Sequence, residues 1–161
     1  MPRRGNARLV QSARLDSRAA AEYFVLFRLA QMGFLASPAT SPGAELVACS
    51  SRGTRVALLR VRARDGGGRF TVERGTERVA RNRAFVFVDF PERPGEEPVC
   101  FVVPASAVAA EVQRVPAWPA GAEAEAELGA FREAWHLLGL TRPNGALSSP
   151  ATVTSPSSPA A

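Results

Sequence analysis

Apolar and polar residues alternate along the middle of this chain in a pattern that predicts short β-strands. The clearest stretch is ALLRVRARD, at residues 57–65. Successive side chains of a strand point to opposite faces, so one face carries leucine, valine and alanine while the other carries Arg60, Arg62 and Arg64. The residues just upstream on the arginine face are apolar. A strand whose face changes from apolar to cationic is typical of the mouth of a site.

Other short apolar runs, separated by glycine, proline and polar residues, predict the rest of a sheet. We expect strands at 34–37, 45–49, 55–63, 69–72, 84–90 and 99–103. The sequence DGGG at 65–68 predicts a turn, and residues 73–82 are expected to form a short helix or a loop.

Three segments have the composition and spacing of helices. The first is capped by Asp16 or Ser17 and runs to Met32, where Gly33 ends it. Its residues are apolar around most of the circumference, which indicates burial. A second helix is expected to start at Pro104. A last helix is expected over 123–139, with one apolar stripe formed by Leu128, Phe131, Trp135 and Leu138.

The two ends of the chain lack these patterns. Residues 1–15 are expected to form a basic flexible arm, and residues 16–140 a folded domain. The tail at 141–161 is rich in proline, serine and alanine, so it is expected to be disordered. The order of elements within the domain predicts an α/β fold with a mixed central sheet flanked by helices.

Charge is distributed unevenly along the chain. All twenty basic residues are arginine, and the net charge is +5. Residues 52–83 contain ten arginines and three acidic residues, whereas residues 84–161 contain four arginines and nine acidic residues. This asymmetry predicts either a surface that faces a polyanion or a charge match within the molecule.

The number and position of the cysteines, and the length of the apolar runs, exclude some classes of protein. Cys49 and Cys100 both fall in apolar strand-like runs, which favours buried, reduced thiols and a cytoplasmic location. A single histidine and two distant cysteines argue against a zinc site with four ligands. The apolar runs are far shorter than the roughly 18 residues that a membrane span needs, so no membrane partner is expected.

Several stretches together resemble the PD-(D/E)xK nuclease-like superfamily, and most closely the small bacterial domains akin to Holliday-junction resolvases. The resemblance covers about residues 17–140, and five stretches carry it: AAEYFVLFRLAQMGF, SPGAELVACSSRGTRVALLRVRAR, AFVFVDF, VCFVVPASAVAAEV and FREAWHLLGL. It implies a restriction-endonuclease-like αβββαβ core.

The resemblance also implies where the catalytic residues of relatives would stand. Glu22 matches the helix glutamate, and Glu45 stands where relatives have a strand aspartate. Arg60 takes the position of a glutamine or glutamate, and Arg62 takes that of the lysine that activates water. In active relatives the carboxylates at these positions bind Mg²⁺. Here Glu22 and Glu45 are the candidate metal ligands, if a metal binds at all.

The arginines change the expected chemistry of those positions. A guanidinium group offers Mg²⁺ no oxygen and repels it, and its pKa above 12 prevents it from accepting a proton. We therefore expect no metal cofactor, unless the domain is active and uses Mg²⁺. Our hypothesis is that a network of Glu22, Glu45, Arg60 and Arg62 fills the metal pocket.

Three functions remain open. The first is a catalytically degenerate nuclease-like domain that binds nucleic acid or a partner protein. The second is an active metal-dependent DNA endonuclease, and the third is an interaction or regulatory protein with no role in nucleic-acid binding. The candidate partners are DNA, another protein and a second copy of the chain. The candidate nucleic-acid contacts are Arg60, Arg62, Arg64, Arg69 and Arg74.

Overall fold

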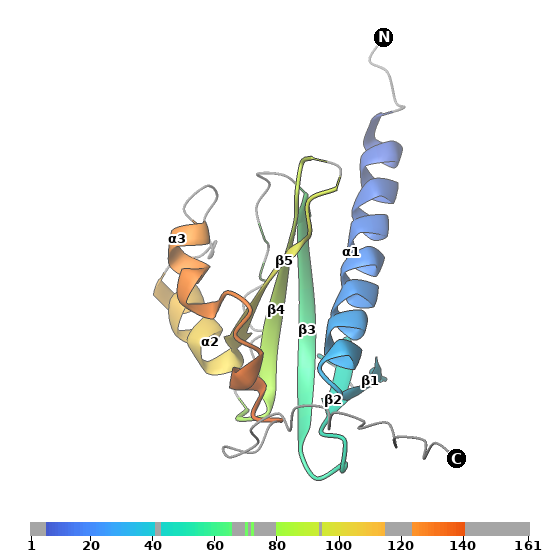
Figure 1. The fold of residues 1–161 in the computed structure, drawn as a ribbon. Coiled ribbons are helices and arrows are strands. Elements are labelled where there is room, and N and C mark those ends of the chain that lie inside the picture. The colour runs from blue at the N-terminus through green and yellow to red at the C-terminus, as the bar shows by residue number, and fades with distance from the viewer. Residues whose placement is uncertain are drawn as a thin grey trace, which may run out of the picture.

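The structure is a computed structural model in which a five-stranded sheet separates two helical layers (Figure 1). Helix α1 packs on one face of the sheet, and helix α2 packs on the other. The structure describes residues 6–40, 43–65, 70, 72, 80–93, 95–114 and 124–140.

The sheet is mixed, and its strands lie in the order in which they follow one another along the chain. They are β1 (Leu35–Pro38), β2 (Leu46–Cys49), β3 (Val56–Asp65), β4 (Arg83–Phe90) and β5 (Val99–Pro104). Neighbouring strands are antiparallel except for β3 and β4, which are parallel. The expected α/β class with a mixed central sheet flanked by helices is therefore confirmed.

The parallel pair needs a long connection from the end of β3 back to the start of β4. Phe70 and Val72 belong to this connection, and both are buried against the face that α2 covers. Neither residue lies in a strand, although a strand was predicted at 69–72. Most of the helix or loop predicted at 73–82 lies outside the described residues.

Helix α1 (Asn6–Gln31) supplies the core on its side of the sheet. Ala21, Val25 and Leu29 follow one another at intervals of four residues and are fully buried. They pack against the apolar face of β3, formed by Leu59 and Val61 among others. This spacing places one stripe of the helix on the sheet.

The opposite face of the sheet is covered by helix α2 (Ala105–Arg114). Val108 and Val112 of α2 pack there with Phe85 and Phe87 of β4, and Phe70 meets Phe87 edge to face with 5.0 Å between ring centroids. Because both faces of β4 are buried, its sequence reads as an almost continuous apolar run.

The start of α1 differs from the sequence expectation. The helix begins at Asn6, not at Asp16 or Ser17, so residues 6–15 of the expected flexible arm are helical. The stretch NARLVQSARL contains no glycine or proline and is rich in good helix formers. Extending an existing helix through such residues costs little, because the nucleus has already formed further along the chain.

The expected helix over 123–139 is wrong. Helix α3 covers only Ala124–Leu128, and 3₁₀ turns follow at Gly129–Phe131 and Trp135–Leu138. Leu128 is buried on the α2 side of the sheet, whereas Trp135 and Leu138 are buried on the α1 side. A straight helix cannot bury one stripe on both sides of a sheet, so the segment breaks as it passes the edge of β5.

The structure also bears on the expected lack of a membrane span and on the two cysteines. No helix among the described residues is long and apolar enough to cross a membrane. Cys49 is half-buried in β2, Cys100 is buried in β5, and both are free thiols.

Candidate functional site

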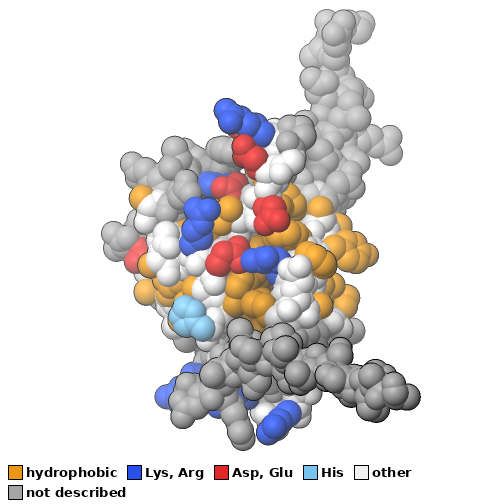
Figure 2. Space-filling view, in the orientation of Figure 1, with side chains coloured by type: hydrophobic (Ala, Val, Ile, Leu, Met, Phe, Trp, Pro, Cys, Tyr) orange, Lys and Arg blue, Asp and Glu red, His pale blue; other side chains and the backbone are white. Residues whose placement is uncertain are grey.

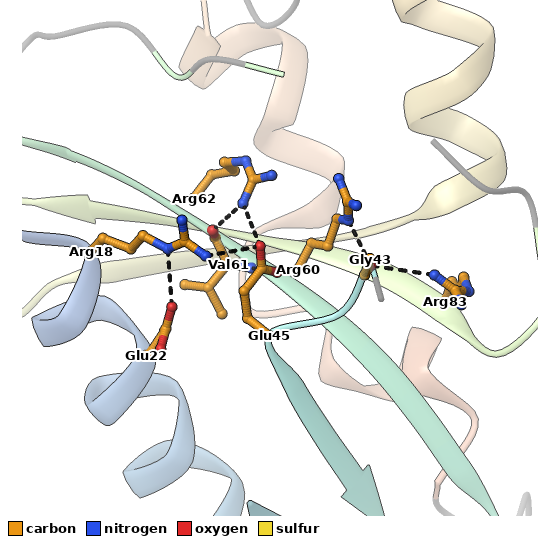
Figure 3. Close-up of polar contacts among 8 residues, drawn as sticks. All are labelled: Arg18, Glu22, Gly43, Glu45, Arg60, Val61, Arg62 and Arg83. Carbon is orange, nitrogen blue, oxygen red and sulfur yellow. Dashed lines mark hydrogen bonds and ion pairs between the residues drawn. The ribbon is translucent and has the colours of Figure 1, made fainter. Parts of the chain in front are cut away.

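Glu45 stands at the centre of a polar cluster beside β3 (Figure 3). It directly precedes β2, and its backbone N–H donates to the carbonyl of Leu59 at 2.9 Å. Its Oε2 accepts the backbone N–H of Val61 at 3.2 Å. Its Oε1 accepts Arg62 Nη1 at 3.1 Å and Arg18 Nη2 at 3.2 Å. With a side chain only 14% exposed, Glu45 is held by two cations and one amide.

Arg18 joins the two glutamates that the sequence singled out. Its Nε donates to Glu22 Oε1 at 3.1 Å, while its Nη2 reaches Glu45. The guanidinium of Arg18 is thus the group that links Glu22 and Glu45. The sequence interpretation did not include Arg18. The contact with Glu22 could have been predicted, because side chains four residues apart on a helix lie close together and opposite charges at that spacing attract. The contact with Glu45 could not.

Arg60 does not join this cluster, contrary to the predicted network. Its Nε donates to the carbonyl of Gly43 at 2.6 Å, and Arg83 Nη1 approaches the same oxygen at 3.3 Å (Figure 3). A small open pocket surrounds this meeting point. The other residues that line it are Leu58, Ala84, Phe85 and Ala105.

Glycine is favoured at position 43 by its backbone conformation and by its close neighbours. Its φ of +80° lies in a region that side chains disfavour. A Cβ atom there would also lie 3.0 Å from Arg60 Nη2 and 3.3 Å from Arg83 Nη1. The absence of a side chain therefore lets two guanidinium groups approach the backbone from two sides.

The Gly43 pocket brings like charges together. Both donor nitrogens contact one oxygen, so the two guanidinium groups lie close together. The carbonyl accepts hydrogen bonds but carries no net charge. Among the described residues, Arg83 forms no ion pair with a carboxylate.

The third arginine of the β3 face is paired inside the molecule. Arg64 forms an ion pair with Asp89, its neighbour across the parallel pair β3–β4. Its guanidinium also lies 4.8 Å from the ring centroid of Phe70, and its side chain is only 8% exposed. Arg62 and Arg64 are therefore matched by carboxylates of the same chain. Arg69 and Arg74, the other predicted nucleic-acid contacts, lie outside the described residues.

The residues present do not fit the magnesium site that the resemblance implies. Magnesium needs several oxygen ligands in octahedral geometry at about 2.0–2.1 Å. Here both oxygens of Glu45 already accept N–H donors, and the guanidinium of Arg18 stands between Glu45 and Glu22. Within the described ranges, no three acidic, histidine or cysteine side chains are grouped as a metal site requires.

A second polar centre, which the sequence interpretation missed, lies at Glu133. This carboxylate accepts Arg28 Nη2 and Trp135 Nε1, each at 2.7 Å, and the backbone N–H of Cys100 at 3.0 Å. It connects α1, β5 and the C-terminal segment. Glu133 has a positive φ of 48°, unusual for a residue other than glycine, and the three donors explain why this conformation is retained.

Burial and hydrogen bonding act in opposite directions on the pKa of Glu133. Burial raises it, but the donors from Trp135, Arg28 and Cys100 outweigh burial and hold the pKa below its ordinary value. Burial also raises the pKa of the Cys100 thiol to about 12, with the charge of Glu133 adding to this effect. Cys100 therefore stays a thiol at neutral pH and is a poor nucleophile.

Comparison with protein-family models, with curated proteins and with solved structures gave no match. The inference of a function therefore rests on the charged clusters and the exposed surfaces of the chain.

Proposed function

We propose that this chain is a nuclease-like α/β domain that has lost hydrolytic activity and binds the backbone of nucleic acid through arginines at one end of its sheet. The observation that carries the proposal is the position of Arg18. Its guanidinium contacts both Glu22 and Glu45, the positions at which the resemblance implies metal ligands. A fixed organic cation thus replaces the charge of a divalent ion.

The chemistry of the cluster supports the loss of hydrolysis. Metal-dependent phosphodiester cleavage needs an ion to activate water and to stabilise the developing charge. Arg62 holds the position implied for the activating lysine, donates to Glu45 and cannot accept a proton near neutral pH. The chain contains no lysine that could take over that role.

The proposed binding surface is the end of the sheet at which β3 and β4 begin. The two strands are parallel, and Leu58 lies opposite Arg83, so the residues that precede both strands gather at this end. The arginines there are Arg52, Arg55, Arg81 and Arg83. In Figure 2 the described charged side chains visible at the lower end are basic, whereas basic and acidic side chains lie next to one another across the middle.

Arginine is suited to phosphate because its planar fork donates two parallel hydrogen bonds. Arg52 and Arg81 are exposed, so their donors are within reach of a long polyanion. Arg62 and Arg64, in contrast, face carboxylates inside the molecule. The local charge therefore favours the strand-start end over the strip along β3 as the contact surface.

A salt series of duplex DNA binding tests this proposal. If three or four arginines contact phosphates, the logarithm of the binding constant should fall with the logarithm of salt concentration with a slope of about −3 to −4. Arg52→Gln and Arg81→Gln should each make the slope less steep by about one unit. Arg93→Gln, an exposed arginine in the loop between β4 and β5, is the matched control. If the protein does not bind duplex DNA at low salt, or if its affinity does not depend on salt concentration, the nucleic-acid function is contradicted.

Hydrolysis is tested separately with supercoiled plasmid. We expect no nicking with Mg²⁺ or Mn²⁺ and no rise in the melting temperature of the protein when either ion is added. Metal-dependent nicking that disappears in Glu45→Gln would instead establish the active endonuclease.

A second candidate function, binding of a partner protein, rests on a different observation. Tyr23 and Phe27 stand four residues apart on α1, and their side chains are 73% and 57% exposed. Hydrophobic side chains also gather along the α1 side of the molecule in Figure 2. A concentration series in sedimentation velocity tests a second copy as the partner. Concentration-dependent dimers that Tyr23→Ser and Phe27→Ser abolish would favour this function.

A further inference from the structure

We infer that a second copy of this chain docks on the outer face of helix α1, with the two copies of the helix antiparallel. The inference rests on the second candidate function, binding of a partner protein. It specifies the partner, the residues in contact and the orientation of the two helices.

The outer face of α1 is apolar, although the solvent side of a surface helix is normally polar. Five exposed residues lie within an arc of about 100° when each residue turns the helix by about 100°. They form what we call the α1 stripe: Ala19, Ala20, Tyr23, Phe27 and Ala30. The stripe points away from the sheet, because Ala21, Val25 and Leu29 form the buried side of the same helix (Figure 2).

The distribution of charge on the helix favours an uncharged partner surface. Arg18, Glu22 and Arg28 lie more than about 100° around the helix from the middle of the stripe. Each is bound within the chain, since Arg18 contacts Glu22 and Glu45, and Arg28 contacts Glu133. A nucleic acid or a strongly charged protein therefore finds no opposite charge on the α1 stripe. An identical stripe meets it without like-charge repulsion.

The order of side chains along the stripe is compatible with a two-fold interface. Tyr23 and Phe27 stand at its centre, and alanine follows on each side at Ala20 and Ala30. Because this order is symmetric about Val25, the stripe presents the same sequence of large and small side chains in both directions. In a two-fold interface the same patch is used twice and must be complementary to itself. With the axis beside Val25, Tyr23 of each copy meets Phe27 of the other.

The position of the basic end of the sheet favours the antiparallel orientation over the parallel one. Helix α1 ends near the start of β3, at the end of the molecule that carries Arg52 and Arg81 (Figure 1). A parallel pair brings these like charges together, whereas an antiparallel pair places them at opposite ends, beyond the screening length of about 10 Å. The two helix dipoles also oppose each other in the antiparallel pair.

The area of the stripe predicts a reversible dimer. A fully buried aromatic side chain removes about 150–250 Å² from solvent, and Tyr23 and Phe27 are 73% and 57% exposed. The aromatic side chains of two copies therefore offer on the order of 400–600 Å², to which the alanines add. Interfaces below about 1,200 Å² are typical of weak or transient complexes. We expect the dimer to form at micromolar concentrations of the chain and to dissociate on dilution.

Disulfide cross-linking of the full chain tests the orientation. Ala20→Cys and Ala30→Cys are made in separate chains, each with Cys49→Ser, because Cys49 is half-buried whereas Cys100 is buried. In the antiparallel pair, position 20 of one copy faces position 30 of the other. The two copies of position 20 lie ten residues apart along the helices, or about 15 Å, and a disulfide spans no more than about 7 Å between Cα atoms. Mild oxidation should therefore link a mixture of the two chains and leave each chain alone unlinked.

Variants of the stripe connect the cross-link to the proposed contacts. Tyr23→Ser should raise the dissociation constant of the dimer by about tenfold or more, as expected for a central aromatic residue, and sedimentation velocity measures it. Val56→Ser is the matched control and should change it less than about twofold. Its side chain is 44% exposed but alternates with those of β3 that pack against α1, so it points to the other face of the sheet.

Each other outcome counts against the inference in a distinct way. Cross-linking of the Ala20→Cys chain with itself establishes a parallel pair, which overturns the inference and leaves self-association in place. Equal cross-linking of all samples reflects random collision and overturns it, as does a dimer that Tyr23→Ser leaves unchanged. A chain that stays monomeric at every concentration overturns both the inference and self-association. The salt series of DNA binding judges the nucleic-acid function independently of these results.

Discussion

Arg60 and Arg62 stand two residues apart on the same face of β3, yet their environments are opposite. Arg62 donates to the carboxylate of Glu45, which also binds Arg18. Arg60 donates to the neutral carbonyl of Gly43, which it shares with Arg83. The comparison shows that one alternating pattern of arginines places one guanidinium group against a carboxylate and the next against a backbone carbonyl that a second arginine also contacts.

The largest effect is expected from removing the centre of the cluster around Glu45. Glu45→Ala leaves Arg62 without its carboxylate and the Val61 amide without its acceptor, so it should lower the free energy of unfolding by about 2 to 3 kcal/mol. Glu45→Gln is the matched control. It keeps an acceptor for the amide and should lose about half as much. Urea unfolding measures both, and a loss below about 0.5 kcal/mol for Glu45→Ala would contradict the assigned role.

Glu133, like Glu45, is a carboxylate that accepts hydrogen bonds from three donors, so its removal can be compared with that of Glu45. At neutral pH, Glu133→Gln should lower the free energy of unfolding by about 1 to 2 kcal/mol, because an amide accepts more weakly from Arg28 and Trp135 than a carboxylate does.

The pH dependence of this loss follows from the lowered pKa of Glu133. A carboxylate whose folded pKa lies below the ordinary value of 4.5 contributes stability above that value and loses it as pH falls through the folded pKa. The difference between the wild type and Glu133→Gln should therefore be constant above about pH 5 and shrink in more acidic solution. Urea unfolding from pH 3 to pH 7 measures it, with exposed Glu92→Gln as the control. A difference that stayed constant down to pH 3 would be inconsistent with the lowered pKa.

The two arginine environments can be compared directly with a pair of matched variants. Arg62→Met should cost about 1 kcal/mol, since it removes a half-buried partner of Glu45. Arg83→Met should cost less than about 0.5 kcal/mol, because the hydrogen bond that it removes, from Arg83 to the carbonyl of Gly43, is long at 3.3 Å. Urea unfolding in phosphate-free buffer measures both variants. If they lose the same free energy of unfolding, the two arginines do not differ in their contribution to stability.

The smallest effect is expected for Glu22→Ala. Glu22 contacts Arg18 through one hydrogen bond, and the Arg18 side chain is 54% exposed. Solvent screens such a pair, so the loss should be about 0.3 to 0.5 kcal/mol. A loss above about 1 kcal/mol would show that the solvent-facing side of the cluster matters more to the fold than the exposures indicate.

The sheet was predictable from the sequence because its signals are local. Strands β2 to β5 coincide with their apolar runs to within one or two residues, and the alternation in β3 correctly placed its arginines on one face. The last helix was not predictable from its apolar stripe. Periodicity reports which residues are buried but not on which side of the sheet, and Leu128 and Trp135 are buried on different sides.

The candidate site was predictable only in part for a related reason. The sequence identified Glu22, Glu45 and Arg62, but it paired them without Arg18 and included Arg60. The contact between Arg18 and Glu45 joins a helix to the start of a strand 27 residues later, and no local pattern encodes it. Arg60 contacts the carbonyl of Gly43 and not the glutamates, and this contact depends on the backbone conformation of Gly43. In the sequence, Gly43 is only one glycine in a loop.

The contact between Glu45 Oε2 and the Val61 amide has a consequence for self-association of the protein. Among the described residues, no strand pairs with β3 on the β2 side beyond Leu59, and another extended chain can join such an edge. Glu45 occupies the Val61 amide on this side with a charged side chain, so we expect it to disfavour the addition of a further strand. Variants that lack it should be watched for fibrillar self-assembly as well as for weakened folding.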